Sequence, residues 1–506
     1  MTDSRTKNTK RNIVASLINT SISLLFRFIS RSVLIYFLGE EYLGLSSLFT
    51  SVLQVLNMAE LGFSGAIVYN MYKPLAENNL NTVCALLAYY RRIYRTIGTI
   101  ILIAGVVVAP FIPKLIKGSY PNDINIYVLY SLYLANTVIS YFLYAYKASL
   151  LEAIQRMDIL KVIYTVVSVF QYTLQILSLA LFHNYYLYVV VMIAGTATQN
   201  IIAAVMAKKF YPEYECRGEI SSATKKDIIS RVKGLMICNI SGVTYTTFDS
   251  IILSSFVGLK AVARYNNYVT VMQGVTTIIT LVRSAMQASV GNSIAKESIQ
   301  KNYNDMLLWQ FLFSAISSWC VACMAALYQP FMIAWMGNDK LLPMIDVIFI
   351  VCWFNVTSVQ HSYLLYLSGN GLWWELRWPY IWSTVSNLVL NIILGKYFGI
   401  TGIIFATLFS TTVFGLVWQC IIIFKKYFHI SAKEFFKKQI CYFAVSILVA
   451  FVTYRVSIMV PIDGWIGLLI KAIVSAILAT LLLIVIYFKT PIFAKAKTFI
   501  IKARKA

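Results

Sequence analysis

The sequence predicts an all-helical protein that spans a membrane about fourteen times. Hydrophobic residues make up 59% of the chain and charged residues only 12%, which leaves too little polar surface to cover a soluble domain of this size. Apolar runs of about 20 residues recur along the whole length, and each is long enough to cross a bilayer as a helix. The Lys and Arg residues fall mainly between alternate runs, which is typical of a helical membrane protein with a fixed orientation.

The expected spans follow from these apolar runs and from the polar segments between them. In chain order they cover residues 13–38, 43–70, 86–112, 123–146, 159–182, 185–207, 235–257, 261–290, 304–336, 341–368, 378–397, 399–424, 438–460 and 465–488. Because this number is even, both termini are expected on the same side of the membrane.

The positive charges indicate which side that is. Most of the 43 Lys and Arg residues lie in the two tails and in the loops on the side of the termini. This excess predicts cytoplasmic termini. The net charge of +23 is then explained by topology and by contact with membrane lipids, so no nucleic-acid partner is expected.

An internal repeat is visible in the sequence. The segment 32–39 (SVLIYFLG) resembles the segment 250–258 (SIILSSFVG), and matching Gly39 to Gly258 gives an offset of 219 residues. A parallel repeat predicts two similar six-helix lobes, related by a pseudo-twofold axis along the membrane normal, with a cavity between them. We expect an N-lobe, a cytoplasmic connecting loop, a C-lobe, and two extra helices with a basic tail, at residues 1–207, 208–234, 235–427 and 428–506 in that order.

Two arginines interrupt the first span. Arg27 and Arg31 are four residues apart, so on a helix they share one face. A charged side chain near the bilayer centre costs about 2.5–3.5 kcal/mol on the insertion scale. Such a face is tolerated only where it looks into protein or a water-filled cavity, and we expect it to line the path of an anionic substrate.

Glu60, Asp249 and Arg283 are further charges inside expected spans. The repeat places Asp249 at nearly the depth of Arg31, and Arg283 about one helical turn from the depth of Glu60. The sequence thus predicts two tiers of charge, each with one charge per lobe, in a cavity that is positive overall. The alternative is that these residues form internal ion pairs that lock helices together and bind no ligand.

The sequence contains no Walker A motif, no paired metal-ligand spacing on a polar face and no GxSxG motif, so we expect no catalytic site, cofactor or metal. Cys320 and Cys323 form a CxxC spacing, but they lie on an apolar span, where packing is the expected role. His361 is also inside a span, where it either titrates or is a satisfied packing residue, and the second role is the expected one. Short loops opposite the termini argue against a membrane glycan polymerase or ligase.

Several features of the first 80 residues occur together: the pair Arg27 and Arg31, the Tyr-Phe-Leu-Gly motif that ends at Gly39, and the Glu-Leu-Gly-Phe-Ser motif at residues 60–64. With them the chain resembles the polysaccharide-flippase branch of the multidrug/oligosaccharidyl-lipid/polysaccharide (MOP) exporter superfamily. The second half, with Asp249, looks similar to the same family, so the resemblance covers essentially the whole chain.

The resemblance implies a MATE-like fold of two lobes that alternate access. It implies outward movement of undecaprenyl-pyrophosphate-linked O-antigen, capsule or exopolysaccharide repeat units across the bacterial inner membrane, with other polysaccharide-assembly proteins as partners. By this resemblance, Arg27, Arg31 and Arg283 are cavity cations that hold the pyrophosphate or sugar acids. Two alternatives stay open: a murein-precursor (lipid II) flippase, which also carries arginines on its first span, and a cation-coupled small-molecule antiporter, which usually carries an acidic residue there.

Overall fold

The computed structural model describes residues 5–60 and 63–505, and these residues form helices joined by short loops, with no strand among them. Within this part of the chain, ten helical runs are long and apolar enough to cross a membrane. The chain separates into two compact units, residues 1–263 and 264–506. The predicted all-helical, multi-pass membrane fold is confirmed.

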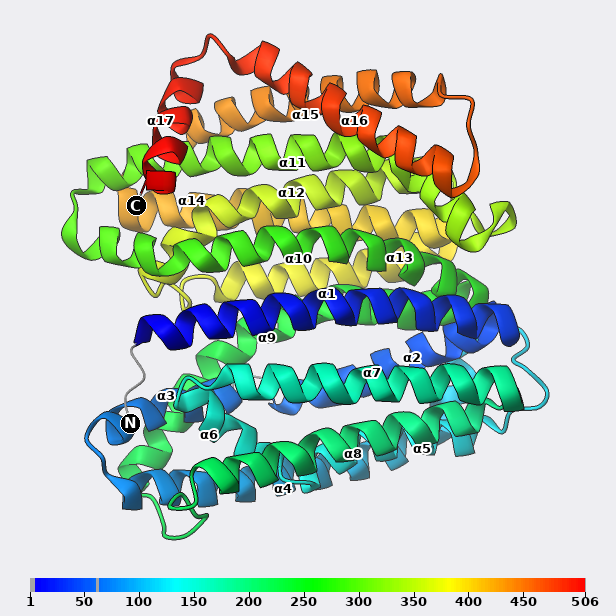
Figure 1. Ribbon diagram of the computed structural model, residues 1–506, viewed down its shortest axis with the longest axis vertical. Coiled ribbons are helices and arrows are strands. Elements are labelled where there is room, and N and C mark those ends of the chain that lie inside the picture. The colour runs from blue at the N-terminus through cyan, green and yellow to red at the C-terminus, as the bar shows by residue number, and fades with distance from the viewer. Residues whose placement is uncertain (1–4, 61–62, 506) are drawn as a thin grey trace. The chain divides into compact units, whose positions relative to one another are not determined.

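The first unit contains the helices coloured from blue to green in Figure 1. Within it α7 packs between α1 and α8, α2 packs against α9, and α5 packs against both α4 and α8. Its elements are α1 (Arg5–Phe37), α2 (Glu40–Asn57), the 3₁₀ turn Met58–Glu60, α3 (Phe63–Ala76), α4 (Leu80–Val108), the 3₁₀ helix Ala109–Leu115, α5 (Ile126–Phe142), the 3₁₀ turn Ala145–Lys147, α6 (Ala148–Ala153), α7 (Met157–Phe182), α8 (Tyr185–Phe210), α9 (Ser222–Phe256) and the start of α10 (Leu259–Lys296).

The second unit contains the rest of α10 and all later elements. They are α11 (Ile299–Met336), the 3₁₀ turn Asn338–Lys340, α12 (Met344–Gly369), α13 (Arg377–Ser410), the π-helical stretch Thr411–Trp418, α14 (Gln419–Ile423), the π-helical stretch Phe424–Phe428, α15 (Lys433–Ile458), α16 (Gly464–Tyr487) and α17 (Pro491–Lys505). A kink at Gly399, where φ is 58°, separates the two spans expected at 378–397 and 399–424.

The turn between α1 and α2 depends on a glycine. Gly39 has φ 102° and ψ 175°, a backbone conformation that is essentially restricted to glycine. Gly258, also with a positive φ of 121°, forms the corresponding turn between α9 and α10. Just beyond these turns the backbones approach closely, because a Cβ atom on Gly44 would lie 2.3 Å from the carbonyl oxygen of Leu259.

The 219-residue offset also holds at helix starts. Asn79 caps α4 by accepting a hydrogen bond from the backbone of Thr82, and Ser298 caps α11 by accepting one from the backbone of Lys301. Each cap satisfies a backbone N–H group that has no partner inside the helix. The repeat expected from the sequence is therefore present in the helix boundaries as well as in the turns.

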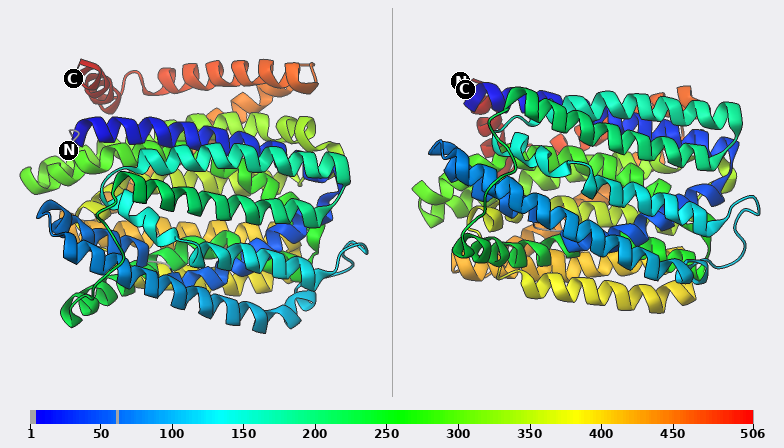
Figure 2. Two further views of the ribbon diagram at one scale, coloured as in Figure 1. Left: turned by 60° about the horizontal axis from the view of Figure 1, so that its bottom comes forward. Right: turned by 90° about the horizontal axis from the view of Figure 1, so that it is seen from below.

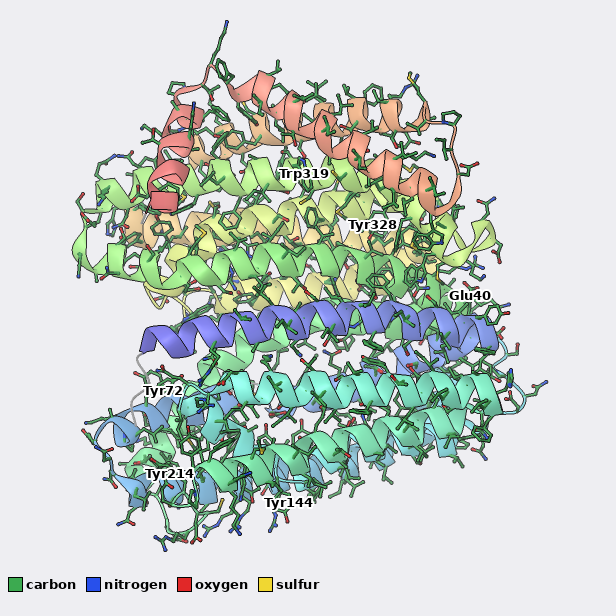
Figure 3. All side chains as sticks on the ribbon, viewed as in Figure 1. Glu40, Tyr72, Tyr144, Tyr214, Trp319 and Tyr328 are labelled. Atoms are coloured by element: carbon green, nitrogen blue, oxygen red, sulfur yellow. The ribbon has the colours of Figure 1, made fainter. Side chains whose placement is uncertain are left out.

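The helices added after the repeats pack on α11. The indole nitrogen of Trp319, labelled in Figure 3, donates to the carbonyl oxygen of Ala476 at 3.2 Å and to the hydroxyl of Thr480 at 3.1 Å, and this joins α11 to α16. The last helix, α17, runs across α11, α15 and α16 and not along them (Figures 1 and 2). Its Phe499 ring contacts Trp309 at a centroid distance of 5.0 Å.

The second expected span differs from its prediction. Residues 43–70 were expected to form one helix, but α2 ends at Asn57 and the turn Met58–Glu60 follows before α3 begins at Phe63. Residues 61 and 62 of the Glu-Leu-Gly-Phe-Ser motif lie outside the described residues. The break places Glu60 at the end of a helix and not in the middle of one.

Candidate functional site

The two arginines of the first span share one continuous helix. Arg27 is exposed, whereas Arg31 is partly buried and makes polar interactions with neighbouring groups. Arg31 lies close enough to Arg27 and to Tyr188 of α8 for their charges to interact. The neighbouring Ser30 hydroxyl is 2.9 Å from the Tyr188 hydroxyl, which ties this face of α1 to α8.

Asn12, near the start of α1, has a structural role. Its side-chain nitrogen donates to the carbonyl oxygen of Gln155 at 3.0 Å, and its side-chain oxygen accepts from the backbone of Asp158 at 2.8 Å. Arg156 adds an ion pair to the Asp158 carboxylate at 3.0 Å. These contacts join the beginnings of α1 and α7, so the arginines farther along α1 are held on a fixed helix.

Glu60 lies in a cluster of tyrosines in the first unit. Its carboxylate accepts hydrogen bonds from the hydroxyls of Tyr94 on α4 and Tyr141 on α5, the latter at 2.7 Å. Both tyrosines are buried, and the Tyr90 ring packs edge-to-face against Tyr94 at 4.5 Å. Each carboxylate oxygen of Glu60 therefore has one phenol donor, and these bonds join the end of the second span to α4 and α5.

Asp249 is fully buried on α9 and makes polar interactions of its own. Its helix packs against α2, and one contact between them is a hydrogen bond of 3.3 Å from the Thr247 hydroxyl to the Gln54 side chain. Ser250 and Ser254 are also buried, so α9 places a polar face in the interior. The pairing of Asp249 with Arg31 stays a prediction.

Arg283 lies half-buried on α10 in the second unit, close enough to His361 of α12 for its charge to act on the imidazole. The Phe313 ring of α11 is 5.9 Å from the His361 ring. The expectation that His361 is a satisfied packing residue was wrong, because both of its buried ring nitrogens lack a hydrogen-bond partner among the described residues. The pairing of Arg283 with Glu60 stays a prediction.

Sequence reasoning missed the tyrosine cluster and the importance of His361. The four-residue spacing of Tyr90 and Tyr94 was the available signal for the first, because it places both rings on one face of a helix. No local signal links His361 to Arg283. The two residues are 78 positions apart in the sequence, and they are close only because α10 and α12 are neighbours.

A surface pocket of about 490 Å³ lies elsewhere in the first unit. It is lined by the first turns of α4 and α9 and by the loop between α8 and α9, through Asn81, Thr82, Ala85, Arg217, Gly218, Glu219, Ile220, Ser221 and Thr224. The Glu219 carboxylate in its wall is 3.2 Å from the Arg92 guanidinium. Acidic and basic groups therefore occur together in the wall of this pocket.

The comparison with protein families identifies the chain. A family model described as polysaccharide biosynthesis protein matches residues 9–286, which is more than half of the sequence. The chain belongs to the polysaccharide biosynthesis protein family. The predicted resemblance to the polysaccharide branch is therefore confirmed at the level of this family.

Solved structures agree with this family in fold. The chain is similar to the lipid II flippase MurJ in an inward closed conformation, with a TM-score of 0.64 and 15% identity, covering 94% of this chain and 98% of that one. It is also similar to an inward-facing multidrug resistance MATE transporter of the MOP superfamily, with a TM-score of 0.60 and 13% identity, covering 80% and 97%. A MOP superfamily transporter from Pyrococcus furiosus gives a TM-score of 0.57 at 16% identity, covering 83% and 96%.

No curated protein matches this member of the polysaccharide biosynthesis family. At these identities the solved structures establish the fold, and the substrate has to be argued from the residues of this chain.

Proposed function

We propose that the protein is a flippase for undecaprenyl-pyrophosphate-linked oligosaccharide repeat units. It moves O-antigen, capsule or exopolysaccharide units from the cytoplasmic to the periplasmic leaflet of the bacterial inner membrane by alternating access. The observation that supports this proposal is the family match together with three arginines on helices long and apolar enough to cross a membrane, Arg27 and Arg31 on α1 and Arg283 on α10.

The chemistry of the substrate explains why these cations are useful. A lipid pyrophosphate with a glycan has a charged, hydrated head that cannot cross hydrocarbon unaided. Arginine binds diphosphate through a planar pair of donors and stays charged at all working pH values. The membrane potential favours outward movement of an anion by about 2.3 kcal/mol per charge per 100 mV, so no nucleotide-hydrolysis site is required.

The proposal is tested by deleting the gene in its native cell and following the glycan. We expect surface glycan to disappear while lipid-linked repeat units build up on the cytoplasmic leaflet, and the cells to stay intact. Lysis with arrested cell-wall synthesis would favour the lipid II flippase. Altered drug resistance with normal surface glycan would favour the antiporter.

The orientation has its own test. In a variant without native cysteines, we expect a cysteine at Asn122 or Asn338 to react with an impermeant thiol reagent added outside intact cells. A cysteine at Ser221 or Ser298 should react only after the membrane is opened. Reaction of the Ser221 position from outside would contradict cytoplasmic termini and, with them, outward export.

A further inference from the structure

His361 is an unusual buried group in the second unit. It is 9% exposed, and neither Nδ1 nor Nε2 has a hydrogen-bond partner among the described residues. A neutral imidazole has one donor and one acceptor nitrogen, and a protonated one has two donors. Leaving a buried polar group without a partner is unfavourable, so the site favours a ligand that supplies one.

The packing of α10 against α12 brings Arg283 close to His361. Gln287 donates to the carbonyl oxygen of Leu365 at 3.3 Å across a separation of 78 residues, and Gly291 meets Gly369, one turn farther along each helix, at the same separation. Arg283 and His361 are also 78 residues apart, and each lies one helical turn before Gln287 and Leu365, respectively. The Nε atom of Arg283 is buried and lacks a partner among the described residues.

The groups around this pair include no acid that acts on it. From α10 the Arg283 guanidinium acts on His361, from α11 the Phe313 ring packs beside it, and from α13 the Tyr380 hydroxyl acts on Arg283. Among the described residues no carboxylate balances the guanidinium charge at this site. A buried cation and an imidazole with open nitrogens form a receptor for a negatively charged ligand with oxygen acceptors.

We propose that Arg283 and His361 form an oxyanion-binding site within the second unit, and that binding of the oxyanion adds a proton to His361. Without the anion, the neighbouring guanidinium disfavours a second positive charge on the imidazole. A bound phosphoryl or carboxylate group reverses this effect, because both cations then face negative oxygens. The proton comes from the surrounding water, and no bond to the anion is made or broken.

This inference rests on the proposed transport of an anionic lipid-linked glycan. It adds that binding of this substrate is linked to uptake of a proton. The same oxyanion chemistry occurs in the diphosphate and in acidic sugars of the substrate. Inorganic pyrophosphate and glucuronate are therefore separate probes for the two sources.

The test uses the full-length protein in lipid nanodiscs with ¹⁵N-labelled histidine. The chain has only three histidines, His183, His361 and His429, so His→Gln variants assign every imidazole signal. With a saturating probe at pH 7, we expect the His361 nitrogens to shift to imidazolium values while the signals of His183 and His429 stay in place. His361→Gln should weaken binding of the probe about tenfold, whereas the control His183→Gln should bind as wild type.

Arg283→Lys and Arg283→Gln separate binding from folding. The Lys variant keeps the charge and should show a reduced shift of His361, and the Gln variant should show none at unchanged thermal stability. A response to pyrophosphate alone assigns the site to the diphosphate, and a response to glucuronate alone assigns it to the sugar acid. No response of His361 to either probe, or wild-type binding by His361→Gln, overturns the inference even if the protein flips lipid-linked glycans normally.

Discussion

The two repeats carry different charged groups, and neither group has a counterpart at the equivalent position of the other repeat. In the first repeat Glu60 accepts hydrogen bonds from Tyr94 and Tyr141. The residues 219 positions later than Glu60 and Tyr94 are Ile279 and Phe313, which are buried and apolar. The acidic cluster of the first repeat therefore has no counterpart in the second.

The cationic pair shows the reverse difference. Arg283 and His361 correspond, by the same offset, to Ser64 and Phe142 in the first repeat. The turns and helix caps repeat between the halves, whereas the charged residues do not. The repeat therefore sets the backbone positions, and each half acquires its chemistry from a few side chains placed on that common frame.

The largest effect is expected at Arg27. This variant tests whether the first repeat also needs a cation. Arg27→Ala should express well but lower surface glycan more than tenfold, with lipid-linked units retained on the cytoplasmic leaflet. Arg27→Lys should keep partial function, because a point charge still attracts phosphate. Normal surface glycan in the Ala variant at matched expression would show that transport does not use this arginine.

A charge swap tests whether Arg31 is a partner of Asp249 or of the substrate. Arg31→Asp and Asp249→Arg should each lower export strongly, though by less than Arg27→Ala. If Arg31 binds substrate, the double variant should remain inactive at normal protein levels, and this is the expected result. Restored surface glycan in the double variant would instead assign both residues to a structural ion pair.

Substitutions at the two turn glycines test the common frame itself. Gly39→Ala and Gly258→Ala should each destabilise the protein by about 1–3 kcal/mol, because alanine is strained at these positive φ values. The effect should be larger at Gly258, where a Cβ would lie 3.1 Å from the carbonyl oxygen of Lys117, than at Gly39, where the space is open.

Gly291→Ala is the matched control for these turns, because its helical position has open space around the added Cβ. Thermal unfolding of the purified variants measures the differences. A Gly39→Ala variant as stable as Gly291→Ala would contradict the strained turn.

The smallest difference between a variant and its control is expected within the acidic cluster. Tyr141→Phe removes a donor to the Glu60 carboxylate, and a hydrogen bond to a charged group contributes about 1.5–3 kcal/mol. Tyr130→Phe is the control, because that hydroxyl donates to the neutral carbonyl oxygen of Gly105 at 3.2 Å and should cost about 0.5–1.5 kcal/mol. In a Glu60→Gln background the two losses should become equal, and a difference that persists would mean that Tyr141 acts by packing.

Much of the frame was predictable from the sequence. Long apolar runs determine spans by length alone, and the match of Gly39 to Gly258 located the second repeat, including the start of α11. The break at Met58–Glu60 was not predicted, although Asn57, Glu60 and Gly62 interrupt the hydrophobic pattern there, because polar residues and glycine also occur inside continuous membrane helices. The partners of Glu60 and the proximity of Arg283 to His361 depend on which helices are neighbours, and no local pattern encodes that.

The interrupted second span has a consequence for where water reaches. A helix that stops inside a bilayer leaves backbone N–H and C=O groups without helical partners, and hydrocarbon supplies none. Non-helical backbone at membrane depth is tolerated only where it is enclosed by protein or lines an aqueous cavity. The 3₁₀ turn at Met58–Glu60, with an acid and two phenols beside it, therefore marks a hydrophilic level within the first unit.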